Sequence, residues 1–251
     1  MIRMLYGSLT KAFMGVVVLM SFFASTETGF CGSQKTIRYV AIGDSYTIGT
    51  GARTDESWPA VITQRLKNKG VLIELEANLG RNGWTTQNLM DYELPELEKL
   101  HPDLVTVLIG ANDWVREVDS ETFQMHMREI FNRLVKIVPD PSRILVITIP
   151  DFSVMSSGMD YSNGRDISKG IAEFNGIILK EAETHQLTVI DLYPLSQTMG
   201  QDLSLAASDG LHPSAPTRLA HWSHKGVCRL GSIRHRSQGL VLDRWRTQEK
   251  S

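Results

Sequence analysis

Short apolar runs alternate with longer amphipathic segments along the middle of the chain. The apolar runs predict five strands, over residues 37–42, 71–77, 104–109, 144–149 and 188–192. Between them, apolar side chains recur every three or four residues, which predicts helices over 58–68, 86–100, 120–138 and 167–185. Mostly apolar strands that alternate with helices are typical of a parallel sheet covered on both faces.

The order of these elements predicts one α/β domain. Connections between parallel strands are right-handed, so the helices are expected on both faces of the sheet, as a three-layer α/β/α sandwich with a five-stranded parallel sheet. A chain of 251 residues with 42% hydrophobic content is large enough to bury one substantial core. We predict that this domain spans residues 36–222.

Polar residues follow the predicted strands at the points where these strands end. Ser45 comes directly after the first strand, Gly83 lies in the loop after the second, and Asn112 follows the third. Asp209 and His212 lie beyond the fifth strand. Because the carboxyl ends of parallel strands share one edge of a sheet, we expect these residues to converge there.

Together these residue types supply the roles that acyl transfer needs. A serine hydroxyl becomes a good nucleophile when a histidine accepts its proton, and a carboxylate orients that histidine. Ser45, His212 and Asp209 are predicted to fill these roles. The backbone N–H groups of Ser45 and Gly83 and the side-chain amide of Asn112 are predicted to form the oxyanion hole.

Four sequence blocks resemble the SGNH (GDSL-type) hydrolase family. They read Gly-Asp-Ser-Tyr at 43–46, Asn-Leu-Gly-Arg-Asn-Gly at 78–83, Gly-Ala-Asn-Asp at 110–113 and Asp-Gly-Leu-His-Pro at 209–213. Tyr46 stands where the family often has leucine. The resemblance extends over residues 37–222 and implies a flavodoxin-like sheet, hydrolysis of esters or thioesters, and no cofactor or metal.

Each block also has a purely structural interpretation. Gly83 alone could be a turn glycine, and Asn112 with Asp113 could be a helix cap. Asp209 with His212 could simply stabilise a turn. The occurrence of all these residues together at strand ends favours a catalytic site. A flavodoxin-like cofactor binder is the third alternative, but the first loop lacks a lysine for phosphate. The remaining histidines before residue 209 are expected on the surface: His101, His126 and His185.

Aromatic and methionine side chains near the blocks suggest how substrate is bound. Trp84, Trp114 and Met155 are expected to border the cleft, with Met159 and Tyr161 nearby, although they could equally pack the loops. The predicted partner is a small-molecule ester or lipid, cleaved by a broad esterase or lysophospholipase-like activity. Hydrolysis of acetyl groups on carbohydrate is the alternative.

Residues 1–30 are typical of a secretory signal, since a basic start precedes an apolar run and small residues. The run is shorter than the roughly 20 residues that a membrane span needs. We therefore expect a secreted or periplasmic protein. Alternatives are membrane association through an uncleaved N-terminal anchor, or a lipoprotein attached at Cys31.

The net charge of −2 does not indicate a protein that binds nucleic acid, but the charge is unevenly distributed. From residue 216 onward there are eight Lys or Arg against two Asp or Glu. The basic segment 223–251 has no clear apolar period and departs from the family; it resembles a replaced terminus or another reading frame, or alternatively a tail for an anionic surface. If this tail supports His212 poorly, the protein would be a catalytically impaired member of the family that only binds ligands.

Cys31 and Cys228 fit neither a disulfide framework nor a zinc site. The oligomeric state stays open.

Overall fold

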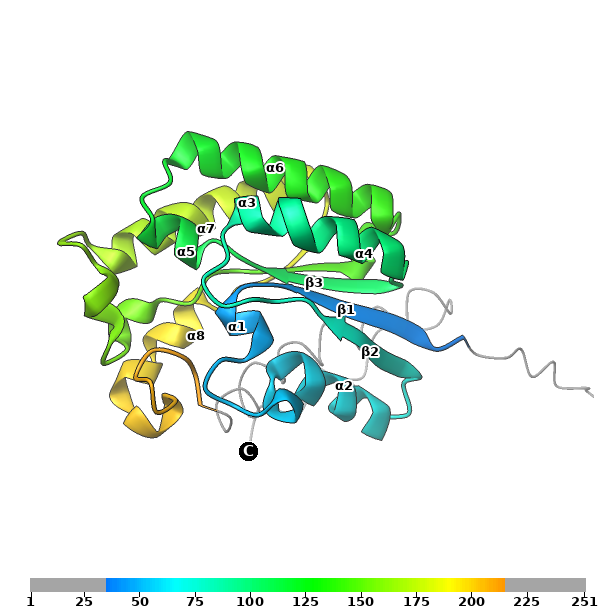
Figure 1. Ribbon diagram of the computed structural model, residues 1–251, viewed down its shortest axis with the longest axis horizontal. Helices are drawn as coiled ribbons and strands as arrows, with labels where there is room; N and C mark the ends of the chain where they lie inside the picture. The colour runs from blue at the N-terminus through cyan, green and yellow to red at the C-terminus, as the bar shows by residue number, and fades with distance from the viewer. Residues whose placement is uncertain (1–34, 215–251) are drawn as a thin grey trace, which may run out of the picture. The chain divides into compact units, whose positions relative to one another are not determined.

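The computed structural model describes residues 35–214 and confirms the predicted α/β fold. Its five strands are all parallel and lie in the order β2-β1-β3-β4-β5, the flavodoxin-like order (Figure 1). The strands are β1 (Ile37–Gly43), β2 (Ile73–Asn78), β3 (Leu104–Leu108), β4 (Ile144–Ile147) and β5 (Thr188–Ile190). The chain direction across the sheet reverses between β1 and β3, so the loops after these two strands separate and leave room for a site.

Long helices cover both faces of the sheet, as expected for a three-layer sandwich (Figure 1). One face carries α2 (Trp58–Asn68). The other carries α6 (Ser120–Ile137), α7 (Ile167–Thr184) and the helical segment from α3 (Thr86–Asn88) to α4 (Leu94–Leu100). Three short helices lie at the carboxyl edge of the sheet: α1 (Ser45–Ile48), α5 (Ala111–Val115) and α8 (Tyr193–Gln197).

The predicted helix over residues 86–100 contains a wider turn. A π-helical turn, η2 (Leu89–Glu93), separates α3 from α4. Pro95 lies in the first turn of α4 and has no N–H to donate to the carbonyl of Asp91, four residues earlier. The helix widens ahead of this proline, and π turns of this kind are often found at functional sites.

The core contains buried side chains of the sheet and of helices on both of its faces, among them α2, α4, α6 and α7. Every residue of β3 is buried, and Tyr39 of β1 is fully buried with its hydroxyl 2.9 Å from that of Thr106. Phe123 of α6 stacks on Phe174 of α7, with ring centroids 4.1 Å apart and planes at 14°. This stacked pair joins the two long helices.

Several predictions concern residues outside 35–214. They are the signal or anchor over 1–30, lipid attachment at Cys31, the unpaired pattern of Cys31 and Cys228, and the basic segment 223–251. Within the part of the chain that the structure describes, no helix is both long and apolar enough to cross a bilayer.

Replacement of Phe123 by alanine should lower the free energy of unfolding by about 3–5 kcal/mol, because it opens a cavity and removes the stack on Phe174. Urea denaturation of the purified protein measures this. Met125 lies on the same helix but is 54% exposed, so Met125→Ala should stay within about 0.5 kcal/mol of the parent. Equal effects of the two substitutions would contradict this packing.

Candidate active site

The turn after β1 places Ser45 at the carboxyl edge of the sheet. Gly43 has φ +144°, and a Cβ there would lie 2.0 Å from the carbonyl oxygen of Leu108, so only glycine fits. Asp44 caps the next helix, since its Oδ1 accepts the N–H of Tyr46 at 3.0 Å. Ser45 is the first residue of α1, and its own N–H therefore has no acceptor within the helix.

Ser45, His212 and Asp209 form a continuous chain of hydrogen bonds. His212 Nε2 lies 2.8 Å from Ser45 Oγ, and His212 Nδ1 lies 2.7 Å from Asp209 Oδ2. The imidazole is buried, with 7% of the residue exposed, and its ring lies 5.4 Å from that of Tyr46. The structure thus brings together residues separated by 167 positions in the sequence, in the order that was predicted.

Asp209 is held as a charged carboxylate. Partial burial by itself would raise its pKa, but donated hydrogen bonds from the N–H groups of His212 and Leu211 and from the imidazole outweigh this and lower the pKa below its usual value. Both backbone bonds reach Oδ1 at 2.9 Å, so Oδ2 remains for the imidazole. The turn from Asp209 to His212 therefore fixes the orientation of the ring locally.

Contacts within residues 35–214 also hold the backbone around His212. Its carbonyl accepts the N–H of Ala207 at 2.7 Å, and the N–H of Ser214 donates to Leu205 at 2.7 Å. The carbonyl of Gly210 accepts the N–H of Ser157 at 2.9 Å. These bonds tie the histidine turn to the segments before it and to the loop after β4. The support of His212 is thus at least partly independent of the chain beyond residue 214.

Asn112 contacts the loop after β2, which contains Gly83, the other predicted oxyanion donor. Asn112 Nδ2 donates to the carbonyl of Trp84 at 3.0 Å, which holds its side chain against the loop after β2. An amide nitrogen carries two hydrogens, so this contact uses one of the two donors. Gly83 has φ +74°, a conformation that favours glycine.

Arg116 is part of this site and was missed by the sequence analysis. Its Nη2 donates to the carbonyl of Gly83 at 2.7 Å, which fixes the peptide group next to the predicted oxyanion donor. The residue follows α5, four positions after Asn112. No motif marks this arginine, and its partner is 33 residues away in the sequence.

Asp113 connects the site to the helical layer. It is fully buried and accepts the N–H of Thr86 at 2.9 Å, so it caps the start of α3. The Thr86 hydroxyl also lies 2.8 Å from His126 Nδ1. The expectation that His126 and His185 are surface residues is therefore corrected: both are half-buried and hydrogen-bonded, His185 to Asn132, whereas His101 is exposed.

Two of the three predicted substrate contacts are corrected by the structure. Trp114 is 5% exposed and packs edge-on against Phe152, with the Arg165 guanidinium 4.0 Å above its ring. Met155 is also buried, at 7% exposed. Both point into the packing between loops and helices because apolar side chains next to a site are drawn into the core as readily as toward a ligand.

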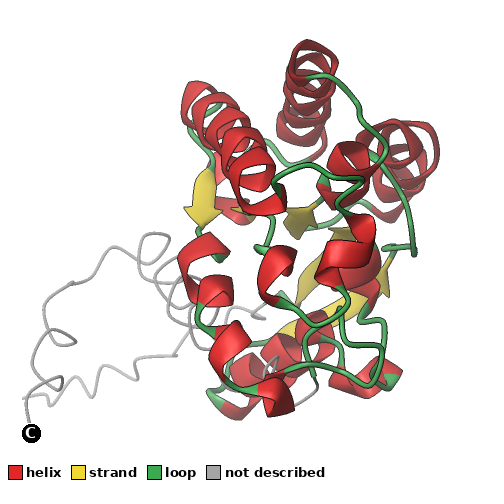
Figure 2. Cartoon of the chain, turned by 90° about the vertical axis from the view of Figure 1, so that its left-hand side faces the viewer, coloured by secondary structure: helices red, strands yellow, loops and turns green. Residues whose placement is uncertain are grey.

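Trp84 does line a pocket, together with Ile48 of α1, the helix that begins at Ser45. The pocket is formed between the chain after α1 and the loop after β2, at the edge of the sheet that faces the viewer in Figure 2. Its lining combines one indole with polar groups, among them Thr50, Arg81 and Asn82. Trp84 also packs on Tyr92, with ring centroids 5.5 Å apart, and Tyr92 is 62% exposed. An accessible aromatic pair therefore borders this side of the site.

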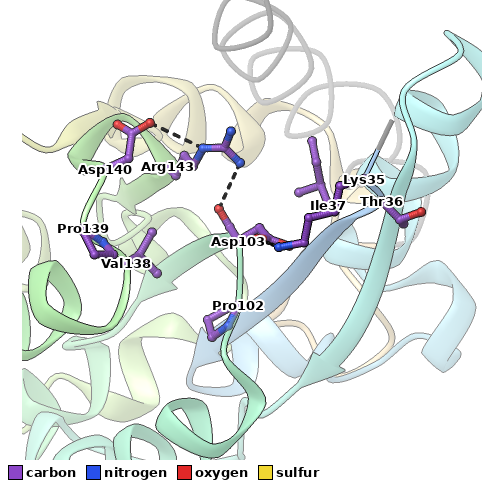
Figure 3. Close-up of a pocket in the computed structure, with 9 residues that line it drawn as sticks. All are labelled: Lys35, Thr36, Ile37, Pro102, Asp103, Val138, Pro139, Asp140 and Arg143. Atoms are coloured by element: carbon purple, nitrogen blue, oxygen red, sulfur yellow. Dashed lines mark hydrogen bonds and ion pairs between the residues drawn. The ribbon is translucent and has the colours of Figure 1, made fainter. Parts of the chain in front are cut away.

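A second pocket lies at the opposite edge of the sheet, where the strands begin (Figure 3). Its charged groups are paired with one another: Arg143 lies 3.4 Å from Asp140, and Lys35 lies 2.7 Å from Asp103. No serine, cysteine or histidine lines it. Among residues 35–214, no group of three or more metal-ligating side chains is gathered as a metal site.

Asp209→Asn should lower the melting temperature at pH 7, and the difference from the parent should shrink as the pH falls below 3.8. A carboxylate whose pKa is lowered by folding stabilises the protein above its unfolded pKa, and this contribution is lost as the pH falls through the folded value. Asparagine keeps an oxygen for the N–H groups of Leu211 and His212. Calorimetry of both proteins across this range is the measurement, and a constant difference would contradict the assignment.

The comparisons with known proteins agree with this geometry. The GDSL-like lipase/acylhydrolase family matches residues 41–217. An arylesterase of Vibrio mimicus is 27% identical over 158 residues, covering 60% of this chain and 74% of that protein. A lipase/acylhydrolase from Enterococcus faecalis has the same fold, with a TM-score of 0.63, 22% identity and coverage of 78% of this chain and 97% of that one.

An acetylxylan esterase from Geobacillus stearothermophilus also shares the fold, with a TM-score of 0.56, 20% identity and coverage of 84% of this chain and 97% of that one. At these identities, the two structures establish the fold alone. The family match covers well over half of the chain. The chain therefore belongs to the GDSL-like lipase/acylhydrolase (SGNH) family and is an ester-hydrolysing enzyme of the GDSL type.

Proposed function

We propose that the protein hydrolyses carboxylic esters or thioesters through an acyl-enzyme formed on Ser45. The observation that carries this proposal is the hydrogen-bonded chain from Ser45 through His212 to Asp209, with 2.8 Å and 2.7 Å between the paired atoms. An isolated serine is a weak nucleophile, and a histidine within hydrogen-bond distance supplies the base that it needs.

In the first half of the reaction, Ser45 Oγ attacks the carbonyl carbon while His212 Nε2 accepts the hydroxyl proton. Asp209 stabilises the imidazolium through Nδ1. When the tetrahedral intermediate collapses, the C–O bond to the alcohol (C–S in a thioester) breaks, and His212 gives its proton to the leaving group. The acyl group then remains on Ser45.

In the second half, water attacks the acyl-enzyme and His212 Nε2 accepts a proton from it. Collapse of the second intermediate breaks the bond to Ser45 Oγ, which regains its proton, and the carboxylic acid leaves. The negative oxygen of each intermediate is stabilised by the N–H groups of Ser45 and Gly83 and the second N–H of Asn112. The bonds of Asn112 to Trp84 and of Arg116 to Gly83 hold two of these donors before substrate arrives.

We propose a broad esterase or lysophospholipase-like specificity. The accessible pair of Trp84 and Tyr92 on one side of the site, and the exposed Met159 and Tyr161 on the loop after β4, are apolar surfaces that suit acyl chains or aromatic alcohols. The arylesterase relative supports small esters of this kind.

Hydrolysis of acetyl groups on carbohydrate is the second candidate. The pocket that Trp84 lines is also lined by Thr50, Arg81 and Asn82. An aromatic face flanked by hydrogen-bonding groups is suited to a sugar ring. The structural neighbour described as an acetylxylan esterase is compatible with this candidate.

The alternative of another class is a member that binds such ligands without turning them over. It was suggested by the departure of the tail from the family. The hydrogen bonds around His212 from residues before 215 favour turnover instead. Labelling of Ser45 by a fluorophosphonate, which requires an activated serine, separates the two alternatives.

Ser45→Ala and His212→Ala should each abolish nearly all hydrolysis of a p-nitrophenyl ester, because no nucleophile or base remains. Steady-state kinetics and fluorophosphonate labelling are the measurements. Ser142→Ala, which removes a hydroxyl at the opposite edge of the sheet, should leave both unchanged. Hydrolysis by Ser45→Ala at the parent rate would refute the proposed nucleophile.

Asn112→Ala should lower kcat about 10²–10³-fold, the effect expected when one oxyanion donor is removed. KM should change much less, because the donor acts on charge that develops in the transition state. Kinetics with the same ester give both constants. A loss confined to KM would instead assign Asn112 to substrate binding.

A substrate panel decides between the candidate specificities. It contains acyl esters of graded chain length, a lysophospholipid and an acetylated xylooligosaccharide, each tested on the parent, Ser45→Ala and Trp84→Ala. The broad-esterase proposal predicts the highest kcat/KM on simple esters or the lysophospholipid. A preference for the acetylated sugar that Trp84→Ala removes would support the second candidate.

A further inference from the structure

Glu93 is a buried acid beneath the proposed nucleophile, and the catalytic chain does not include it. It ends the π-helical turn η2 and is only 2% exposed, although the preceding Tyr92 is 62% exposed. Its Oε2 accepts the N–H of Gly43 at 2.7 Å, across 50 residues of sequence. Its Oε1 is buried and has no hydrogen-bond partner within residues 35–214.

The group that Glu93 holds is the start of the turn that carries Ser45. Gly43 is the last residue of β1, two positions before Ser45, and its carbonyl accepts the N–H of Arg81 at 3.1 Å. The next N–H, that of Asp44, donates to Leu108 at 3.3 Å. Glu93 thus supplies the acceptor for one of three successive backbone groups that are fixed by different segments of the fold.

We propose that Glu93 is a positioning residue for Ser45: by accepting the N–H of Gly43, its carboxyl group fixes the turn that places Ser45 Oγ against His212. The proposal rests on the proposed function of Ser45 as nucleophile. An acid that held this turn only for stability would affect folding, whereas a positioning residue also affects the rate at which Ser45 reacts.

The surroundings of Glu93 favour its uncharged form. Burial is the main cause that raises its pKa from 4.5 to about 9; the bond from Gly43 and the charge of Arg81 lower it, and the charge of Asp44 raises it. Asp44 is buried too, with its pKa raised to about 8, and it faces Asp113, which in turn lies beside Thr86 and His126. Near neutral pH, Glu93 is therefore expected to accept the Gly43 N–H as a neutral carboxylic acid.

A neutral acid at this position makes a distinct prediction for stability. Because folding raises the pKa of Glu93, the protein loses stability as the pH rises from about 4.5 through about 9. Glutamine has the same shape as the protonated acid, keeps an oxygen for Gly43 and does not ionise. Glu93→Gln should therefore lack the part of the stability loss at rising pH that ionisation of Glu93 causes.

The test compares Glu93→Gln and Glu93→Ala with the parent and with Glu96→Gln, an exposed control on α4. At pH 7, Glu93→Ala should lower kcat and the rate of fluorophosphonate labelling together, by about 10–100-fold, because a small misplacement of a reacting group has effects of this size. KM should stay within about threefold. Glu93→Gln and Glu96→Gln should stay within about twofold of the parent in both rates.

Melting temperatures from pH 5 to pH 9 form the second arm. The parent and Glu96→Gln should lose stability relative to Glu93→Gln as the pH rises. If Glu93→Ala does not fold, Glu93→Asp, whose shorter side chain fails to reach Gly43, replaces it in the kinetic arm.

Two results would overturn the proposal: a folded Glu93→Ala with the kcat and labelling rate of the parent, or a Glu93→Gln that loses activity as severely as Glu93→Ala. A parent that is not labelled at Ser45 would contradict the proposed function instead. In that event the melting temperatures still test whether Glu93 is protonated near neutral pH. A difference between the parent and Glu93→Gln that does not change with pH would show that Glu93 is not a buried neutral acid.

Discussion

The close approach of Gly43 to the carbonyl of Leu108 is the constraint on which the site depends. A Cβ at position 43 would lie 2.0 Å from that oxygen, so the last residue of β1 can have no side chain. The backbone can then turn sharply between β1 and β3 and present Ser45 at the carboxyl edge. The side chain of Glu93 and the backbone groups of Arg81 and Leu108 hold this turn through hydrogen bonds from three other segments.

The proposed acid–base chain has two parts, one held by the sheet and one held within a single turn. Ser45 is fixed by the sheet, whereas Asp209 and His212 share one short turn whose backbone N–H groups also bind the carboxylate. The pairing of imidazole and carboxylate is made within this one turn, and the bond between Ser45 and His212 joins the two parts, beside the ring contact of Tyr46 with His212. This division explains how the turn retains its geometry through contacts before residue 215.

Buried carboxyl groups distinguish the floor of this site from its rim. Asp44, Glu93 and Asp113 are all nearly or fully buried, and burial raises the pKa of each. Asp209 at the rim has its pKa lowered by the hydrogen bonds that it accepts. The environment thus favours the charged form of the acid next to the imidazole, whereas burial shifts the pKa of the three other acids in the opposite direction.

The sequence by itself determined the strands, the long helices and the residues that meet at the carboxyl edge, because apolar periodicity and strand-end motifs are local signals. Only the tertiary structure decided that Trp114 and Met155 are buried while Trp84 borders a pocket, since a sequence does not reveal which side of a loop faces the core. The roles of Arg116 and Glu93 were likewise invisible. Their partners, Gly83 and Gly43, are 33 and 50 residues away, and such hydrogen bonds exist only once the segments have packed together.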